Sequence, residues 1–218
     1  MELDHYRSGR DPMRPASERY MPKLPPGAET IPEVAAQRER LAMALDEADA
    51  GGDFDKMLTL VDRNCGPALL VDWMTAGRIS REQVREHLAT TWQMADFPNQ
   101  ALGRKTWRVL FRWTGYVSDP LGLPQPTTSV RLFRGCTPGR YHGMAWTSDL
   151  DKARWFARRF IGVPSQRHTT AVFTALVEPA YVLARCNGRE GEQEYVVDTL
   201  ELPRGSIHRY EWCPPPAR

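Results

Sequence analysis

Apolar residues recur at helical spacing through the first half of the chain, which predicts a series of helices there. The first begins where Thr30 and Glu33 resemble a capping box, and it ends at the glycine pair 51–52. A second helix is expected from Asp53, because apolar residues follow at positions i, i+3, i+4 and i+7. These apolar residues are Phe54, Met57, Leu58 and Val61.

Three further helical segments are predicted before residue 120. Pro67 suits the first turn of a third helix, which stops before Gly77. A fourth helix opens at Ser80, with Gln83 completing its cap. A fifth segment runs from about residue 102 to residue 116. The first half of the chain is therefore expected to be essentially all helical.

After residue 120 the pattern changes to short runs rich in β-branched and aromatic residues, which is typical of strands. The runs are SVRLFRG, GMAWTS, TTAVFTALVEP, YVLARC, EQEYVVDTLEL and GSIHRYEW, and one helix is expected among them around residues 149–160. The change follows the turn-rich stretch DPLGLPQPTT. These patterns predict an α+β chain, an N-terminal helical region followed by a β-rich domain.

Residues 1–29 contain many Pro, Arg and Ser and show no periodic apolar pattern. We expect a flexible arm there, or a segment ordered only by packing onto the body of the protein. The predicted organisation is an arm at 1–29, a helical region at 30–120 and a second domain at 121–218.

Composition and residue spacing exclude some classes of protein. The chain has 218 residues, 41% of them hydrophobic, and no apolar run approaches the roughly 20 residues that cross a bilayer. The N-terminus also lacks the apolar core of a secretory signal, so we expect a cytoplasmic protein with no membrane contact. The four cysteines stand far apart and the histidines lack ligand spacing; we expect reduced, mostly buried thiols and no metal.

The bases are unevenly distributed. Between residues 97 and 148 there are seven Lys and Arg against the single acid Asp119, so this stretch should attract anions. Four of these bases form one stripe on the predicted helix at 102–116: Arg104, Lys105, Arg108 and Arg112. The stripe is either a surface that follows the phosphates of DNA or RNA, or a solvated helix face.

Three elements of the second half carry the chemistry, and the first ends in Arg134 and Gly135. In a strand, alternation places Val130, Leu132 and Arg134 on one side, so the guanidinium points into the body of the domain. A guanidinium in such a place needs an anion, and the glycine lets the backbone approach closely. A diphosphate or an internal carboxylate would satisfy it.

The second element is the change from strand to helix after Trp146 and Thr147. Ser148 is the expected N-cap, with Asp151 at the capping-box position, so the hydroxyls would sit at the end of a strand. Capping alone would explain Ser148. Trp155, on the helix that follows, is expected in the core.

The third element is the acidic run Glu190-Gly191-Glu192-Gln193-Glu194. In a strand, Glu192 and Glu194 share a face, so two carboxylates lie side by side at considerable electrostatic cost. A cation, a substrate hydroxyl or a raised pKa would relieve that cost. A solvated face of an edge strand is the alternative.

In combination and order, these three elements resemble the Arg–Ser–Glu class of ADP-ribosyltransferases. The resemblance covers roughly residues 130–202. It implies a split pair of antiparallel sheets that hold NAD, with helices at the periphery. NAD would be a co-substrate, and the acceptor would be a protein or a nucleic acid.

The resemblance also implies roles for individual residues. Arg134 would hold the NAD phosphates, while Thr147 and Ser148 would brace the catalytic carboxylate and the nicotinamide ribose. Glu194 would be the catalytic residue that stabilises an oxocarbenium-like centre, and Glu192 would orient or deprotonate the acceptor. The residues expected to contact NAD are Arg134, Gly135, Tyr141, Trp146, Thr147 and Ser148.

The chain departs from the family pattern in two places. The family's Ser-Thr-Ser appears here as Trp146-Thr147-Ser148, without the first serine. Glu190 also permits a register in which Glu190 and Glu192 form the pair. Tyr141 and His142 precede the second element, and they either contact a ring of the ligand or pack in the domain.

Three functions remain open from the sequence. The first is a mono-ADP-ribosyltransferase that cleaves the nicotinamide N-glycosidic bond of NAD. The second is a DNA glycosylase that uses the same site on a deoxyribose and holds DNA with the basic stripe. The third is a non-catalytic module that binds nucleic acid or protein. In each case the helical region is a candidate for target recognition.

Overall fold

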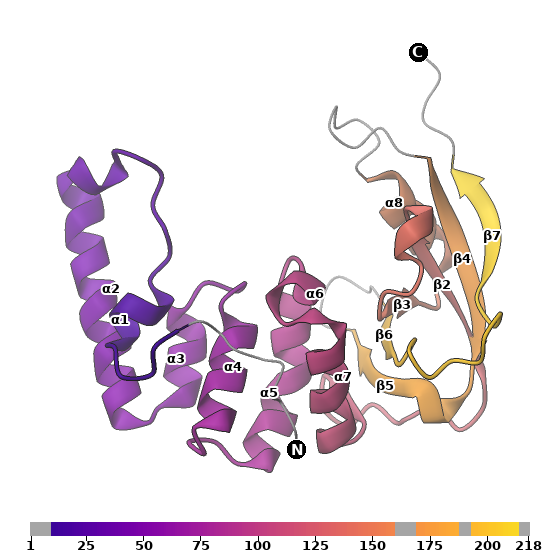
Figure 1. The fold of residues 1–218 in the computed structure, drawn as a ribbon, viewed down its shortest axis with the longest axis horizontal. Coiled ribbons are helices and arrows are strands. Elements are labelled where there is room, and N and C mark those ends of the chain that lie inside the picture. The colour runs from indigo at the N-terminus through magenta and orange to yellow at the C-terminus, as the bar shows by residue number, and fades with distance from the viewer. Residues whose placement is uncertain (1–9, 160–168, 188–192, 214–218) are drawn as a thin grey trace. The chain divides into compact units, whose positions relative to one another are not determined.

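The structure is a computed structural model that describes residues 10–159, 169–187 and 193–213. The chain forms two compact units, Met1–Thr106 (unit 1) and Trp107–Arg218 (unit 2). Unit 1 is helical and unit 2 is built on a sheet (Figure 1). An α+β chain with a helical N-terminal part is therefore confirmed.

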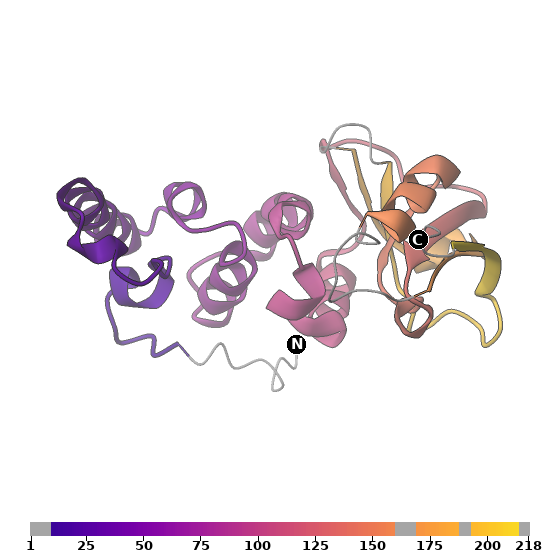
Figure 2. The same cartoon turned by 90° about the horizontal axis from the view of Figure 1, so that it is seen from above.

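Unit 1 consists of successive helices, of which α2 is the longest, as Figures 1 and 2 show. The helices are α1 (Ala16–Tyr20), α2 (Pro32–Gly51), α3 (Phe54–Leu60), α4 (Gly66–Thr75), α5 (Arg81–Met94) and α6 (Pro98–Ala101). Their core is formed by large side chains that lose nearly all exposure, among them Leu45, Met57, Leu69, Trp73, Leu88 and Trp92. The apolar spacing that predicted α3, α4 and α5 is therefore the spacing of the buried face.

In unit 1 the helix starts follow the sequence at Ser80 and Asp53 but not at Thr30. Ser80 accepts from the backbone N–H of Gln83, and the Gln83 side chain accepts from the N–H of Ser80, so the predicted capping box is present. Asp53 likewise caps α3. The capping box at Thr30 was wrong, because α2 starts later, at Pro32, and the Thr30 hydroxyl donates to the carbonyl of Gly27.

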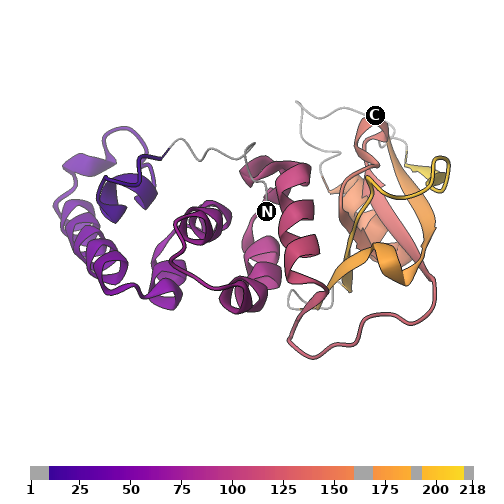
Figure 3. The same ribbon diagram turned by 60° about the horizontal axis from the view of Figure 1, so that its bottom comes forward.

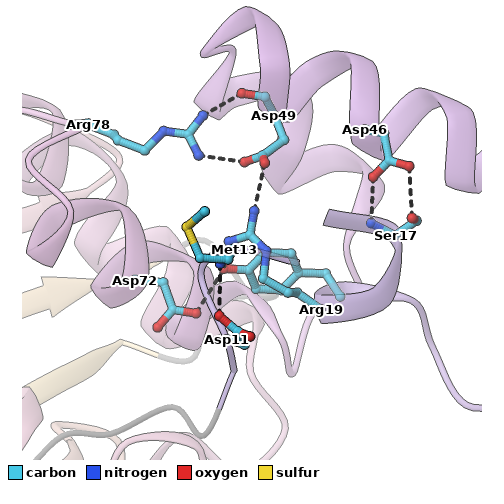
Figure 4. A network of polar contacts seen from close by, with 9 residues as sticks. Asp11, Met13, Ser17, Arg19, Asp46, Asp49, Asp72 and Arg78 are labelled. Atoms are coloured by element: carbon cyan, nitrogen blue, oxygen red, sulfur yellow. Dashed lines mark hydrogen bonds and ion pairs between the residues drawn. The ribbon is translucent and has the colours of Figure 1, made fainter. Parts of the chain in front are cut away.

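The described part of the N-terminal segment is packed onto the other helices of unit 1, which agrees with the second of the two alternatives for residues 1–29 and not with a flexible arm. Tyr20 is fully buried, and its hydroxyl donates to Asp72 Oδ2 at 2.8 Å. Figure 4 shows the surrounding polar contacts: Arg19 and Arg78 both bind Asp49, with N–O distances of 2.6 Å. These bonds hold α1 against α2 and α4, whereas residues 1–9 lie outside the described part.

Unit 2 begins inside α7 (Gly103–Thr114), earlier than the boundary predicted near residue 120. The reason lies in the side chains of α7. Arg108 and Arg112 bind Asp198 of unit 2, and Trp107 stacks on Phe111. The last helix of the predicted helical region therefore belongs mostly to the β-rich unit.

The sheet of unit 2 has seven strands in the order β1-β5-β6-β3-β2-β4-β7. The strands are β1 (Val117–Asp119), β2 (Val130–Cys136), β3 (Ala145–Thr147), β4 (Thr170–Val177), β5 (Val182–Cys186), β6 (Glu194–Val197) and β7 (His208–Cys213). Six of them lie in the runs predicted as strands. β1 was not predicted, because its three residues continue directly from a helical segment.

Pairing differs from the split antiparallel sheets that the resemblance implies. β2 pairs with β3 on one side and with β4 on the other, so all the strands join in a single sheet. The link between β2 and β3 is short and places Phe133 opposite Thr147. β1 pairs parallel with β5, which makes the sheet mixed.

The two faces of this sheet are covered differently. One face carries a core cluster that includes Leu132, Trp146, Tyr195 and Val197. The other face is covered by α8 (Leu150–Arg158), which packs on β2 and β4 (Figures 2 and 3). Side chains of β2, β3 and β6 can therefore contact one another only where they point to the same face of the sheet.

Candidate functional site

Three residues singled out in the sequence lie on three neighbouring strands. Arg134 is on β2, Thr147 ends β3, and Glu194 begins β6, and these strands are adjacent in the order β6-β3-β2. A loop of residues 137–144 separates β2 from β3, whereas α8, β4 and β5 lie between Thr147 and Glu194. Folding therefore brings the second and third predicted elements into direct contact, with the first beside them.

Glu194 and Thr147 share one face of the sheet. Glu194 is opposite Thr147, and Thr147 is opposite Phe133, and directly opposed residues of antiparallel strands point to the same side. Arg134 follows Phe133, so alternation directs it to the other face. The Glu194 carboxylate and the Thr147 hydroxyl therefore lie on the same face of the sheet, and the Arg134 guanidinium lies on the other.

Arg134 binds backbone carbonyls of the loop that leads into β3. Its Nη1 donates to the carbonyl of Ala145 at 2.5 Å, and its Nε donates to that of Arg140 at 3.2 Å. Gly143 makes room for it, since a Cβ there would lie 2.2 Å from Arg134 Nη2. These contacts make Arg134 an organiser of residues 140–145, a function that the sequence did not reveal.

Gly135 has a different purpose from the phosphate approach expected of it. A Cβ at this position would lie 1.9 Å from the carbonyl oxygen of Ala153 and 2.5 Å from the backbone nitrogen of Ala157. Both atoms belong to α8. The backbone of α8 therefore lies directly against Gly135 and occupies the space that a side chain at this position would need.

The hydroxyls after β3 are held in place by the start of α8. Asp149 is the N-cap, accepting from the N–H groups of Asp151 and Lys152, so the prediction of Ser148 as N-cap was wrong by one residue. Thr147 is 4% exposed, and its Oγ1 accepts from the N–H of Asp149 at 3.0 Å. Because Asp149 caps the helix, Ser148 is available for another contact.

Ser148 binds across to β6. Its hydroxyl donates to Gln193 Oε1 at 2.8 Å, and this bond ties the end of β3 to the residue before Glu194. Gln193 has a φ of 43°, in the left-handed region that a residue with a side chain rarely adopts. Such backbone strain is found at functional sites more often than elsewhere. Neither the bond nor the strain could be anticipated from the sequence.

Glu194 lies half-buried between two strands. It is opposite Cys186 of β5 as well as Thr147 of β3. Burial raises the pKa of the Cys186 thiol well above its usual range, and the nearby carboxylates of Glu194 and Asp119 raise it further. The thiol is therefore neutral at physiological pH, and it forms an uncharged wall beside the carboxylate.

Glu190 and Glu192 lie outside the described residues. The alternative register, with Glu190 and Glu192 as the pair, is accordingly left untested. The described strand begins at Glu194, the residue to which the resemblance gives the catalytic role.

Two aromatic residues expected at the ligand are packed in the domain. Trp146 is 2% exposed in the core cluster, and its indole N–H donates to the carbonyl of Gly143. Tyr141 stacks on Phe173 with ring centroids 5.1 Å apart and lies 4.1 Å from the ring of His142. The packing alternative is thus the one that the structure supports for Tyr141.

The basic stripe is engaged in ion pairs over half its length. Arg108 and Arg112 both bind Asp198 Oδ2 at 2.9 Å, and Arg108 also binds Glu201. Asp198 is 1% exposed, so the stripe attaches α7 to the turn after β6. Two members of the stripe are thus engaged with acids of the same unit, while Lys105 is exposed and Arg104 is half-buried, and binding of nucleic-acid phosphates by the stripe stays a prediction.

Three of the four cysteines can be described, and all are free thiols. Cys186 is buried, whereas Cys65 and Cys136 are half-buried. Within the described ranges, no three His, Cys, Asp or Glu side chains lie together as metal ligands would. None of the described helices is long and apolar enough to cross a membrane.

Comparisons of the chain with models of protein families, with curated proteins and with solved structures give no match. The function proposed for the chain therefore rests on the geometry of the site.

Proposed function

We propose that unit 2 is a mono-ADP-ribosyltransferase that cleaves the nicotinamide N-glycosidic bond of NAD and transfers ADP-ribose to a macromolecular acceptor. The observation that carries the proposal is the pairing of Glu194 with Thr147, beside the strand that carries Arg134. A half-buried carboxylate next to a fixed hydroxyl is a suitable environment for stabilising a developing positive charge on a ribose.

In the proposed reaction, the Glu194 carboxylate accepts a hydrogen bond from the 2′-hydroxyl of the nicotinamide ribose. The bond between C1′ and the nicotinamide nitrogen breaks, and its electron pair leaves with nicotinamide. The carboxylate stabilises the oxocarbenium-like centre that remains. A nucleophile of the acceptor then attacks C1′ and loses its proton to Glu192, the role that the family resemblance gives to that residue.

The hydroxyls position the catalytic carboxylate. Thr147 lies directly opposite Glu194, and the Ser148 hydroxyl holds Gln193, the residue before it. These contacts fix the start of β6 before NAD binds, which lowers the cost of organising the site. Glu194 held in this way could accept a hydrogen bond from a hydroxyl of the nicotinamide ribose.

Arg134 acts as a positioning residue in this proposal. Its guanidinium holds the carbonyls of Arg140 and Ala145, so it shapes the loop that precedes β3 and places its positive charge there. A diphosphate near this loop would be attracted by that charge and by Arg140. The proposal therefore rests on the carboxylate and hydroxyls for the ribose, whereas Arg134, on the other face of the sheet, acts through the loop that leads into β3.

The DNA glycosylase alternative has less support from α7 than the sequence suggested. It relied on the basic stripe to hold DNA, and two members of that stripe, Arg108 and Arg112, are paired with Asp198. We therefore favour NAD as the substrate of the site.

Mass spectrometry of the products tests the proposal. Wild-type protein and Glu194→Gln are incubated with NAD, with and without DNA, and nicotinamide, ADP-ribosylated products and abasic sites are measured. The proposal predicts nicotinamide release that depends on Glu194 and no abasic sites. Abasic sites without loss of NAD would instead identify a glycosylase.

A further inference from the structure

Exposed aromatic side chains gather on two elements of unit 2. Trp155 on α8 is 55% exposed, although the sequence predicted it in the core, and Tyr210 and Trp212 on β7 are 50% and 48% exposed. Among the described residues, Phe97 is the other large aromatic side chain with comparable exposure. Leaving such rings in water is costly, so a cluster of them indicates a binding surface.

α8 covers one face of the sheet and contacts β7, the strand at one edge of that sheet. Arg154 of α8 binds Glu211 of β7 through two bonds, Nε to Oε1 at 2.8 Å and Nη2 to Oε2 at 3.0 Å. Tyr210 meets the ring of Phe133 edge-on at 5.5 Å, on the face that α8 covers. Trp212 is opposite Ala171 and so lies on the other face. Trp155 and Tyr210 are therefore the rings of the α8 side.

Cations surround the exposed ring of Trp155. Lys152 Nζ and Arg159 Cζ lie 5.9 Å and 5.8 Å from its centroid, and Arg159 also lies 5.1 Å from the Phe156 ring. Arg158 is exposed one turn beyond Arg154. At helical spacing these side chains form the outer face of α8, opposite the buried Ala153 and Ala157.

The bases of this surface outnumber its acids. α8 with its two caps carries Lys152, Arg154, Arg158 and Arg159 against Asp149 and Asp151, and β7 adds Glu211 on the same face, whereas Arg209 lies opposite Phe173 on the other face. Arg154 binds Asp151 and Glu211, and Asp149 accepts from backbone N–H groups at the start of α8. The hydrogen bonds from Arg154 hold the pKa of Glu211 below its usual range, against a smaller opposing effect of burial. Glu211 is therefore charged at physiological pH, and the four bases still exceed the three acids, so the surface keeps a small net positive charge.

We propose that this α8–β7 surface, formed by Lys152, Trp155, Arg158, Arg159 and Tyr210, binds single-stranded nucleic acid. Unpaired bases stack on exposed aromatic rings, and neighbouring Lys and Arg bind the phosphates between them. The net positive charge favours a polyanion over an apolar protein partner. Binding of the strand is independent of the proposed NAD chemistry, because it uses none of the residues placed in that site.

The first test compares two strands of equal charge. Full-length protein is titrated against a fluorescent single-stranded DNA of about 15 nucleotides and against a strand of the same length whose central nucleotides are abasic. Fluorescence anisotropy should give an affinity at least about tenfold higher for the strand with bases, because stacking contributes to each occupied ring. Equal affinity for the two strands, or no binding, would overturn the proposal.

The second test locates the surface by substitution. Trp155→Ala and Tyr210→Ala should each weaken binding of the base-bearing strand about five- to tenfold or more. Phe97→Ala is the matched control, since it removes an exposed ring of unit 1, and it should leave the affinity unchanged. Loss of binding in all three variants, or in none, would contradict the assignment.

Two further measurements distinguish strand binding at this surface from unfolding of the variant and from the proposed NAD chemistry. Circular dichroism melting should show that Trp155→Ala is folded, because the side chain is exposed. Nicotinamide release from NAD without DNA should be the same in Trp155→Ala and wild type. A protein that binds the strand but leaves NAD intact would therefore uphold the inference while the proposed function fails.

Discussion

At the scale of single residues, close approach of the backbone decides what several positions tolerate. An added methyl group at Gly135 would overlap the Ala153 carbonyl and the Ala157 nitrogen of α8. We predict that Gly135→Ala lowers the free energy of unfolding by about 1–3 kcal/mol, because α8 must move away from β2. Urea unfolding measures this.

A nearby glycine provides the control for that change. A Cβ at Gly139 meets no heavy atom within 4 Å, so Gly139→Ala should alter stability by less than about 0.5 kcal/mol. Equal losses in the Gly135 and Gly139 variants would show that α8 does not seat on Gly135.

The strand positions of the candidate residues could be predicted, but their partners could not. Alternation places Arg134 on the side of Leu132 in β2, and the sequence placed Thr147 at the end of one strand and Glu194 in another. The Arg140 carbonyl that Arg134 binds lies in a loop. Gln193, which accepts a hydrogen bond from Ser148, has an unusual positive φ angle. Loop conformation leaves no periodic signal in the sequence, so these contacts require the structure.

At the scale of elements, the attachment of α7 depends on one buried carboxylate. Asp198 accepts from Arg108 and Arg112, and both arginines are partly exposed, which moderates the effect of losing the charge. We predict that Asp198→Asn lowers the free energy of unfolding by about 1–3 kcal/mol. Urea unfolding followed by tryptophan fluorescence reports it through Trp107, which is fully buried on α7.

The second acid on α7 tests whether burial matters. Glu201 also binds Arg108, but its side chain is 50% exposed, so Glu201→Gln should cost about 0.5 kcal/mol or less. A cost for Glu201→Gln as large as that for Asp198→Asn would contradict the view that the buried carboxylate anchors the helix.

The contact of α1 with α4 gives unit 1 a dependence on alkaline pH. Burial, followed by the charge of Asp72, raises the pKa of Tyr20 far above its usual range. The folded protein keeps this phenol protonated, whereas the unfolded chain loses the proton near pH 10. The stabilisation is therefore complete below about pH 10 and declines as the pH rises further.

Urea unfolding between pH 8 and pH 11 tests this dependence. Tyr20→Phe should be less stable than wild type at pH 8, because it loses the hydrogen bond to Asp72, and the two curves should converge above about pH 10. Tyr210→Phe, which changes an exposed ring, should follow the wild-type curve. Parallel curves for Tyr20→Phe and wild type would refute the assignment.

Local pattern predicted most elements because burial follows the same periodicity as secondary structure. The capping box at Ser80 and the short β-rich runs are examples. β1 escaped prediction since three residues show no period. The ion pairs of Arg108 and Arg112 with Asp198 were not predicted, because Asp198 lies far away in the sequence. The exposure of Trp155 was missed for a similar reason, as a ring at helical spacing resembles a core residue.

At the scale of the whole molecule, the class of fold could be predicted but the sheet order could not. The change from helical to alternating spacing indicates an α+β chain. Placing β3 between β2 and β6 depends on pairing between distant segments, which no local pattern encodes. That pairing is what sets Glu194 opposite Thr147, and the proposed function depends on it.

The rate of nicotinamide release from NAD tests this central claim most directly. We predict that wild-type protein releases nicotinamide and that Glu194→Gln lowers the rate by at least about a hundredfold, because the charge that stabilises the oxocarbenium centre is lost. Glu178→Gln, which changes an exposed carboxylate after β4, should retain the wild-type rate. Equal release by wild type and Glu194→Gln, or none by wild type with any acceptor tested, would contradict the account.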